Sequence, residues 1–396
     1  MSWPMVKLGD VCTINPRLPK NANPEQEVTF LAMAAVSEKG EISSQETRIL
    51  HETKKGFTYF ERGDVLLAKI TPCFENGKAT LTNNLNTQIG FGSTEFHVLR
   101  AFPDLILPEF IFYLVWNERF RIAAAKEMTG SAGQKRVSTD YLKEYKFYLP
   151  SIFEQEKIVA ALNKGYSIHR KRQQAIKLAD DFLRAKFLEM FGTPANNIHR
   201  FPTGKIRDLV DSVNYGTSAK ASIDSGEYPI LRMGNITYQG GWDFTDLKYL
   251  DLSVKEKDKF LVKEGDLLFN RTNSKELVGK TAVYEENRPM AFAGYLIRVR
   301  PNPIGNNYYI SGYLNSIHGK ITLMNMCKSI VGMANINAQE LQNIEILIPP
   351  KHLQDEYEII YKKIKKVLHY GHNYHIIPML MSRRSARLLK HRKALS

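Results

Sequence analysis

The chain has 396 residues, of which 43% are hydrophobic and 24% are charged, and this excludes a wholly disordered protein and predicts about two domains. Its apolar runs are interrupted by proline or charge well before the about 20 residues of a membrane span, which excludes an integral membrane protein. The formal net charge of +14 favours a polyanionic partner. The three cysteines, Cys12, Cys73 and Cys327, are too few for a disulfide framework, so we expect a cytoplasmic protein.

Residues 1–150 contain short apolar runs rich in β-branched and aromatic residues, separated by Gly, Asn and Pro. This pattern predicts a mixed α+β domain, in which the stretch from Pro108 to Lys126 is helical. Gly63-Asp64 precedes the apolar run Val65-Leu66-Leu67. A tight turn that leads into a strand explains this pair without a functional role.

A long helix is predicted for residues 151–192. Ser151 and Glu154 form a capping box, and Gly192 followed by Pro194 ends the helix. Between them, apolar residues recur every three to four positions over about 60 Å of helix. Such a stripe has to pack along another helix, because water cannot satisfy it. We interpret the basic residues of this helix as its solvated face: Lys164, Arg170, Lys171, Arg172 and Lys177.

Residues 193–349 repeat the first domain at an offset close to 200 residues. The segment Gly63-Asp64-Val65-Leu66-Leu67 recurs as Gly265-Asp266-Leu267-Leu268-Phe269, and a Gly-Lys pair begins 14 residues after the first Gly in both halves. Leu149-Pro150 with Gln155-Glu156 recurs as Ile348-Pro349 with Gln354-Asp355. A second domain with the architecture of the first is therefore predicted.

Residues 350–396 are predicted to form a second, shorter helix and a basic tail. Apolar residues such as Leu353, Tyr357 and Ile364 lie on one side, whereas Gly371 and Pro378 interrupt the pattern. We expect the two helices to pack as an antiparallel coiled coil. The predicted fold class is α+β, with two similar domains in tandem, each followed by a long helix. The tail is either a solvated end or a nucleic-acid contact.

No recognisable catalytic motif is present. The chain lacks the Asn/Asp-Pro-Pro-Tyr/Phe signature of methyltransferases and a glycine-rich dinucleotide loop. Gly279-Lys280-Thr281 does not form a phosphate loop, because Ser274 stands where that loop needs glycine. Asp140, Glu144 and Lys146 resemble a nuclease triplet, but an unpaired triplet of this kind is common by chance. We therefore expect no catalysis by this chain.

Three histidines near the C-terminus, His369, His372 and His375, are spaced as metal ligands on one helical face would be. Gly371 and Pro378 favour a surface turn instead, and no carboxylate or Cys completes the set. We expect neither a metal nor a cofactor in this chain.

Polar clusters remain where the two halves carry their loops. The run from Asn270 to Ser274 combines Arg and Asn, which pair with guanine and adenine edges, with hydroxyls suited to phosphate oxygens. In the first half, similar polar residues follow the run from Gly63 to Leu67. Further polar clusters lie around Arg136, Tyr215 and Arg232. The candidate DNA-binding residues are Lys69, Thr71, Asn76, Lys78, Gln134, Lys135, Arg136, Tyr215, Thr217, Ser218, Lys220, Arg232, Asn235, Asn270, Arg271, Thr272, Asn273, Ser274 and Lys280.

These segments also carry a family resemblance. The tandem layout, the run from Leu149 to Ile158 and the run from Gly265 to Ser274 with Val278-Gly279-Lys280 resemble the specificity subunits of type I restriction-modification systems. After Tyr370 the sequence does not resemble the second long helix of that family. The resemblance covers nearly the whole of the remaining chain.

The resemblance implies residues 1–150 and 193–349 as two target recognition domains, each reading half of an interrupted, asymmetric double-stranded DNA target. It implies that residues 151–192 and 350–396 serve as a spacer and as a docking surface for two methyltransferase subunits, which restriction subunits join. The assembled complex would use S-adenosylmethionine, ATP and Mg²⁺ through those partners, while this chain would be non-catalytic.

Three alternatives stay open at this stage. A stand-alone DNA-modifying enzyme conflicts with the missing motifs. A non-specific binder of single-stranded nucleic acid is compatible with the many aromatic residues. A pure coiled-coil adaptor would need only the helices. Footprinting on duplex DNA distinguishes these classes.

Overall fold

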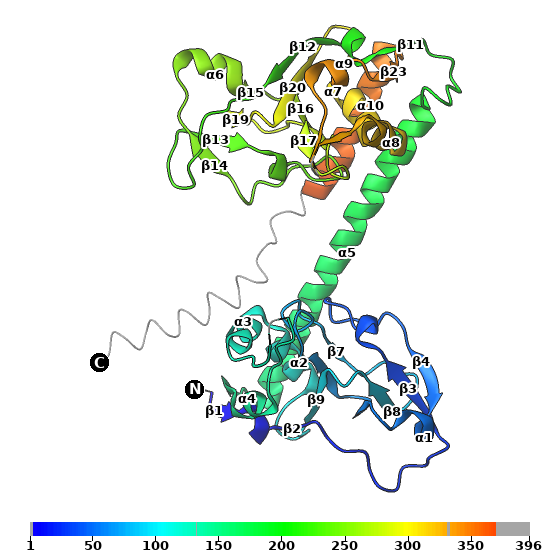
Figure 1. Cartoon of the computed structure of the whole chain (residues 1–396), viewed down its shortest axis with the longest axis vertical. Coiled ribbons are helices and arrows are strands. Elements are labelled where there is room, and N and C mark those ends of the chain that lie inside the picture. Colours follow the sequence, from blue (N-terminus) through cyan, green and yellow to red (C-terminus); the bar gives the residue numbers. More distant parts are fainter. Residues whose placement is uncertain (1–2, 132, 331–332, 370–396) are drawn as a thin grey trace. The chain divides into compact units, whose positions relative to one another are not determined.

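The computed structural model describes residues 3–131, 133–330 and 333–369. The chain divides into two compact units, Met1–Ile168 (unit 1) and His169–Ser396 (unit 2), and the division lies inside the long helix α5 (Ile152–Phe191). Figure 1 labels the elements of both units. No described helix combines the length and the apolar character that a bilayer span requires.

Unit 1 contains two four-stranded sheets and one two-stranded ribbon among its described residues. One sheet has the order β2-β9-β6-β7 and is antiparallel, and the other has the order β4-β3-β8-β5 with β3 and β8 parallel. The strands are β1 (Met5–Lys7), β2 (Cys12–Ile14), β3 (Glu27–Leu31), β4 (Glu46–Ile49), β5 (Thr58–Glu61), β6 (Val65–Ala68), β7 (Ala79–Leu81), β8 (Ile89–Gly92), β9 (Phe96–Ala101) and β10 (Lys146–Tyr148). The helices are α1 (Leu50–Thr53), α2 (Pro108–Trp116), α3 (Glu118–Lys126) and α4 (Thr139–Glu144), with 3-10 helices η1 (Leu8–Asp10) and η2 (Met33–Ala35).

Unit 2 repeats this topology, with sheets ordered β12-β20-β16-β18 and β14-β13-β19-β15 and a ribbon of β11 and β23. The parallel pair recurs as β13 with β19. The strands are β11 (Thr203–Lys205), β12 (Val210–Tyr215), β13 (Tyr228–Leu231), β14 (Lys248–Leu250), β15 (Leu261–Val262), β16 (Leu267–Asn270), β17 (Thr272–Asn273), β18 (Thr281–Val283), β19 (Met290–Phe292), β20 (Leu296–Pro301), β21 (Lys328–Ile330), β22 (Met333–Asn335) and β23 (Glu345–Leu347). The helices are α6 (Val254–Phe260), α7 (Asn307–Asn315), α8 (Ile317–Met326), α9 (Ala338–Gln342) and α10 (Lys351–His369), with η3 (Ile206–Leu209) and η4 (Met233–Asn235). The α+β class and the tandem repeat are confirmed.

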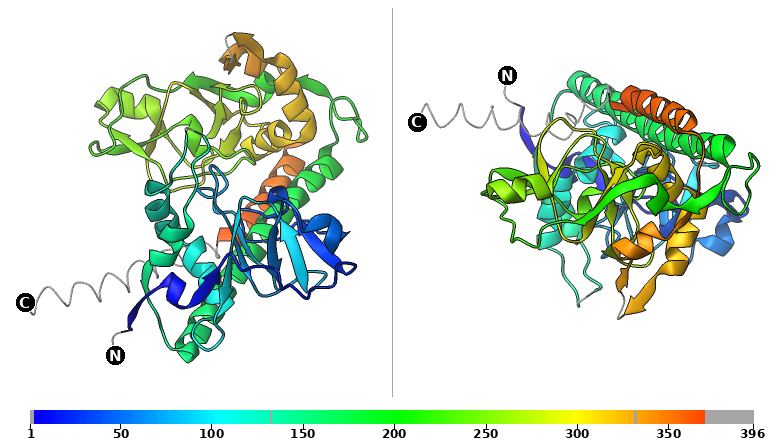
Figure 2. Two further views of the ribbon diagram at one scale, coloured as in Figure 1. Left: turned by 60° about the horizontal axis from the view of Figure 1, so that its bottom comes forward. Right: turned by 90° about the horizontal axis from the view of Figure 1, so that it is seen from above.

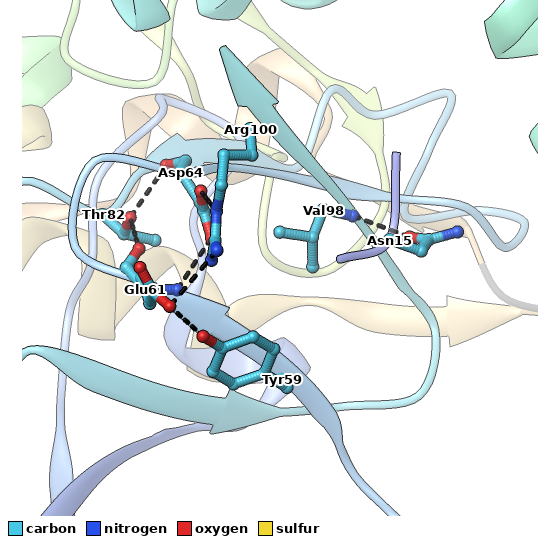
Figure 3. Close-up of polar contacts among 7 residues, drawn as sticks. All are labelled: Asn15, Tyr59, Glu61, Asp64, Thr82, Val98 and Arg100. Carbon is cyan, nitrogen blue, oxygen red and sulfur yellow. Dashed lines mark hydrogen bonds and ion pairs between the residues drawn. The ribbon is translucent and has the colours of Figure 1, made fainter. Parts of the chain in front are cut away.

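The recurring Gly-Asp pair forms a turn that leads into β6 in unit 1 and β16 in unit 2, an inner strand of the β2-β9-β6-β7 and β12-β20-β16-β18 sheets. Gly63 adopts φ 95° and Gly265 φ 87°, backbone conformations that favour glycine. Asp64 Oδ2 accepts the Glu61 N–H at 2.7 Å, and its two carboxylate oxygens accept from Arg100 at 2.8 Å each (Figure 3). In unit 2, Asp266 makes the same bidentate pair with Arg300, at 2.7 and 3.0 Å. The turn interpretation is confirmed, and the aspartate also ties that turn to the neighbouring strand.

The stretch from Pro108 to Lys126 is helical as predicted, with a break at one residue. Two helices, α2 and α3, meet at Asn117, whose backbone is extended (φ −64°, ψ 135°). The Asn117 side chain accepts the Arg119 N–H at 2.8 Å, so it caps the second helix. The spacing of the apolar residues continues across Asn117 and does not reveal the break. The only sequence signal for the break is that asparagine is a favoured N-cap residue.

Helix α5 begins and ends where its local sequence predicts. Ser151 N–H donates to Glu154 Oε2 at 3.0 Å, and Glu154 N–H donates to Ser151 Oγ at 3.4 Å, which completes the capping box. At the other end, Gly192 has φ 67° and its N–H donates to the Leu188 carbonyl at 2.9 Å. Gly192 therefore caps the helix in the left-handed conformation.

The C-terminal part of α5 packs antiparallel to α10 within unit 2, where the two helices run side by side (Figures 1 and 2). The Tyr357 ring lies 5.3 Å from Phe187 and 5.9 Å from Phe191, while Lys365 Nζ pairs with Asp180 at 2.9 Å. Later residues of α10 therefore meet earlier residues of α5, as predicted. Gly371, Pro378 and the basic tail lie outside the described residues.

Unit 2 also buries a cation without a counter-charge. Lys320 Nζ is buried, has no hydrogen-bond partner in the described chain, and lies 4.8 Å from the Tyr238 ring centre. Burial, together with the nearby positive charges of Arg184 and Lys280, lowers the pKa of Lys320 to about 8. The cation–π contact with the Tyr238 ring offsets only part of the free energy that desolvation of this ammonium costs.

We expect Lys320→Met to raise the free energy of unfolding by about 2 kcal/mol at pH 7, because the folded protein no longer desolvates a charge. The pKa of Lys320 is about 8 in the folded chain, against an ordinary value of 10.5. The unfolded chain therefore binds more protons between these values, and the wild type gains stability as the pH rises. The advantage of the variant should shrink from pH 8 to 10 in urea denaturation. The exposed Lys275→Met is the control, and an advantage independent of pH would contradict the explanation.

Candidate nucleic-acid interface

In unit 1, a short polar segment continues the central strand β6 and pairs with a second polar segment. Val137 N–H donates to the Lys69 carbonyl at 2.9 Å, and Thr71 N–H donates to the Lys135 carbonyl at 3.0 Å. We call residues 69–71 with 134–137 edge 1. The pairing brings together Lys69, Thr71, Gln134, Lys135 and Arg136, although Lys69 and Gln134 are 65 positions apart in sequence.

Unit 2 builds the same edge from the matching residues. Strand β17 pairs with β22, with Thr272 opposite Asn335 and Asn273 opposite Ala334, and Ile336 N–H donates to the Arg271 carbonyl at 2.9 Å. We call residues 271–273 with 333–336 edge 2. Strand alternation buries Thr272 on the inner face and leaves Arg271 and Asn273 half-buried on the other face.

The two edges differ in how their arginines are engaged. In edge 1, Arg136 makes a bidentate pair with Glu95, both N···O distances being 2.9 Å. The Arg136 guanidinium lowers the pKa of Glu95 through this hydrogen-bonded pair. In edge 2, the guanidinium of Arg271 lies 4.9 Å from the Tyr215 ring centre, and the described part of the chain provides it with neither an ion pair nor a hydrogen bond.

The lysine of each Gly-Lys pair, for which we predicted a DNA contact, is engaged within its own unit. Lys78 Nζ donates to the Met33 carbonyl at 3.3 Å, and the buried Lys280 Nζ donates to the Met233 carbonyl at 2.7 Å. Each lysine thus satisfies a carbonyl of a 3-10 helix about 45 residues away in sequence. Burial lowers the pKa of Lys280.

Further candidates are engaged or buried inside unit 2. Asn235 is buried and donates to the carbonyls of Asp243 and Asp246 at 2.9 and 3.0 Å, while Arg232 pairs with Asp246 at 2.7 Å. Asn270, Thr217 and the inward-facing Thr272 are also buried, so these three and Asn235 are less accessible to a ligand than the other candidates, whereas Arg232 is half-buried and stays a predicted contact.

The other candidates have accessible side chains. Asn76, Gln134, Lys135, Ser218 and Lys220 are exposed, and Ser274 is half-buried. Ser274 N–H donates to Asn273 Oδ1 at 2.9 Å, which orients that amide. Thr71 Oγ1 donates to Glu75 at 2.9 Å.

An open groove of about 620 Å³ lies beside edge 2. It is lined by Asn214, Tyr215, Thr217, Ser218 and Lys259, among others. Tyr215, which is 42% exposed, thus lies at both the groove and the edge. Sequence reasoning found Tyr215 but missed Lys259, since α6 has no match among the motifs used to align the two halves.

Sequence reasoning also missed a pair of matching positions at which the two edges differ. Lys69 N–H donates to the Glu95 carbonyl at 2.9 Å, and Arg271 N–H donates to the Tyr295 carbonyl at 3.1 Å. Glu95 and Tyr295 therefore occupy matching positions at an offset of 200 residues. Extending the repeat alignment to this offset is the signal that could have identified both.

A metal site is not evident in the described residues, where no group of three or more His, Cys, Asp and Glu could hold an ion. The side chains of His369, His372 and His375 lie outside this description. Asp140 and Glu144 pair with Lys143 at 3.8 Å and with Lys7 at 2.9 Å, respectively.

Comparison with known proteins shows that both repeats match the same protein family. Residues 2–178 and 200–369 both match the family model of the type I restriction modification DNA specificity domain. The chain belongs to this family. Two relatives from Escherichia coli, the specificity subunits of the type I restriction enzymes EcoAI and EcoEI, are 31% and 32% identical to it over 273 residues.

Each of these matches covers 67% of this chain and 46% or 45% of the relative, so the matched region spans about half the length of either relative. The crystal structure of a type I restriction-modification S subunit from M. genitalium has the same fold, with a TM-score of 0.59. It is 14% identical, and the match covers 98% of this chain and 95% of that one.

Proposed function

We propose that this member of the family recognises an interrupted, asymmetric double-stranded DNA target, and that residues 1–150 and 193–349 each read one half. The observation that carries the proposal is that one edge is built twice with unlike side chains. Edge 1 presents Lys69 and Thr71 where edge 2 presents Arg271 and Asn273. Similar frames with different polar groups suit two different half-sites.

We further propose that α5 and α10 form the spacer between the recognition domains and the docking surface for two methyltransferase subunits, with restriction subunits joining the complex. On α5, the side chains of Ile168, Leu178 and Phe182 are about half exposed, and such apolar groups suit a protein partner. The complex would use S-adenosylmethionine, ATP and Mg²⁺ through its partner subunits.

The test is selection of bound duplexes from a randomised library by the full chain together with its methyltransferase partner. We expect two short specified sequences separated by an unspecified spacer, and methyl transfer only when the partner and S-adenosylmethionine are both present. Preference for single strands, or binding without sequence preference, would contradict the proposal.

A separate arm tests whether the chain is catalytic. We expect the purified chain alone neither to methylate nor to cut the selected duplex. Asp140→Ala and Glu144→Ala change the exposed carboxylates that resemble a nuclease triplet. Cleavage by the chain alone that either variant abolishes would show a stand-alone enzyme.

A further inference from the structure

Arg271 combines a fixed backbone with an unused hydrogen-bonding fork. Its N–H donates to the Tyr295 carbonyl at 3.1 Å and its carbonyl accepts from Ile336 N–H at 2.9 Å. No carboxylate in the described ranges pairs with its guanidinium. Arginine presents its donors in a planar fork, so this group can make two parallel hydrogen bonds to one ligand.

The guanidinium of Arg271 lies over the ring of Tyr215. The guanidinium carbon of Arg271 lies 4.9 Å from the Tyr215 ring centre. The Tyr215 hydroxyl in turn accepts the N–H of Ala338, the first residue of α9, at 2.9 Å. Asn337 and Glu340 form a capping box at this helix start, so the anchor of the ring is itself rigid.

Residues 3–131 and 133–168 of unit 1 contain no equivalent arrangement. Its edge carries Lys69 at the position of Arg271, and a lysine ammonium is a point charge without a planar fork. The nearby Arg136 has its fork filled by Glu95. In unit 2, Tyr295 stands in place of Glu95, and no described carboxylate pairs with Arg271.

We propose that Arg271 reads a guanine in the half-site of unit 2, and that Tyr215 is the positioning residue that holds its guanidinium for this contact. The inference rests on the proposed function. Guanine alone presents two acceptors, N7 and O6, side by side in the major groove, and they match the two donors of a fixed arginine fork. A phosphate contact would need the charge of Arg271 but not its fixed plane.

The first experiment uses the full chain with its methyltransferase partner and the duplex selected by the wild type. We expect Arg271→Ala to relax the preference for one guanine in one half-site, with a loss of about 10- to 100-fold in discrimination there. Arg271→Lys keeps the charge and loses the fork, so most of this discrimination should also disappear. Arg288→Ala is the matched control, because Arg288 also stacks on a ring, that of Phe244, but lies away from edge 2.

The second experiment replaces that guanine by 7-deazaguanine, which lacks the N7 acceptor. The wild type should lose about 10-fold in affinity, whereas Arg271→Ala should bind both duplexes equally. An equal effect of the analogue on both proteins would overturn the assignment. So would a loss in Arg271→Ala that is uniform over all sequences, since that identifies a phosphate contact.

The role of Tyr215 is tested by coupling. Tyr215→Ala should reduce discrimination at the same guanine when Arg271 is present and have no further effect in Arg271→Ala. Tyr215→Phe keeps the ring but loses the bond to Ala338 N–H, so we expect a smaller loss at the same base. Additive effects, or a changed preference at another base, would show that Tyr215 does not act through Arg271.

Failure of this inference is distinguishable from failure of the proposed function. Without a two-part target in the wild-type selection, the proposed function fails. With such a target and an unchanged guanine preference in Arg271→Ala, only the assignment of Arg271 fails. Melting temperatures of all variants establish that each is folded before binding is compared.

Discussion

Asp266→Ala is expected to lower the free energy of unfolding of unit 2 by about 4 kcal/mol, since it removes the buried partner of two arginines. Asp266 is 4% exposed and makes a bidentate pair with Arg300, at 2.7 and 3.0 Å. Its carboxylate also lies 3.9 Å from the buried Arg298. Burial lowers the pKa of Arg298, whereas the negative charge of Asp266 raises it, so loss of the carboxylate leaves a desolvated cation uncompensated.

The same change in unit 1, Asp64→Ala, should cost less, about 3 kcal/mol, because Arg100 keeps its contact with Glu61 at 3.2 Å and is partly solvated. Hydrogen exchange read separately on peptides of each unit measures both effects. The exposed Asp140→Ala is the control and should change stability by less than about 0.5 kcal/mol. Equal, small losses at Asp64 and Asp266 would show that the turn, and not the ion pair, supplies the stability.

Tyr357→Ala is expected to lower the free energy of unfolding of unit 2 by about 3–5 kcal/mol and to loosen α10 from α5. The Tyr357 ring is 3% exposed and packs edge-on against Phe187 at 5.3 Å, with Phe191 at 5.9 Å. It also fills the space beside Gly312, where an added Cβ would lie 2.9 Å from the ring. Truncation therefore opens a cavity that these aromatic rings cannot close without moving.

Exchange of the α10 amides and urea denaturation measure this effect. Tyr357→Phe is the matched control, because the ring is retained and its hydroxyl has no hydrogen bond to any described residue. Ile359→Ala, at an exposed position of the same helix, controls for a change in helix propensity. Rapid exchange in both Tyr357→Ala and Ile359→Ala would show that α10 is held by something other than this cluster.

Local signals in the sequence determined much of the architecture. The capping box of Ser151 and Glu154 and the glycine at position 192 predicted both ends of α5, because caps depend on residues within one turn. The repeated Gly-Asp turn predicted that unit 2 copies unit 1, and the strand orders agree. Both predictions use only nearby residues or the recurrence of a motif in the second half, so they need no knowledge of long-range contacts.

Only the tertiary structure showed which polar side chains are engaged within the fold. From sequence, Lys280 and Arg271 were both candidates for a DNA contact, yet Lys280 Nζ donates to the Met233 carbonyl of η4, whereas the Arg271 guanidinium lies over the Tyr215 ring and has no ion pair within the described ranges. Arg136 looked as available as Arg271 until Glu95, 41 residues away, filled its fork. The role of a charged side chain depends on the partners that the fold brings close to it. Those partners can be far away in sequence, so the residues next to the side chain do not identify them.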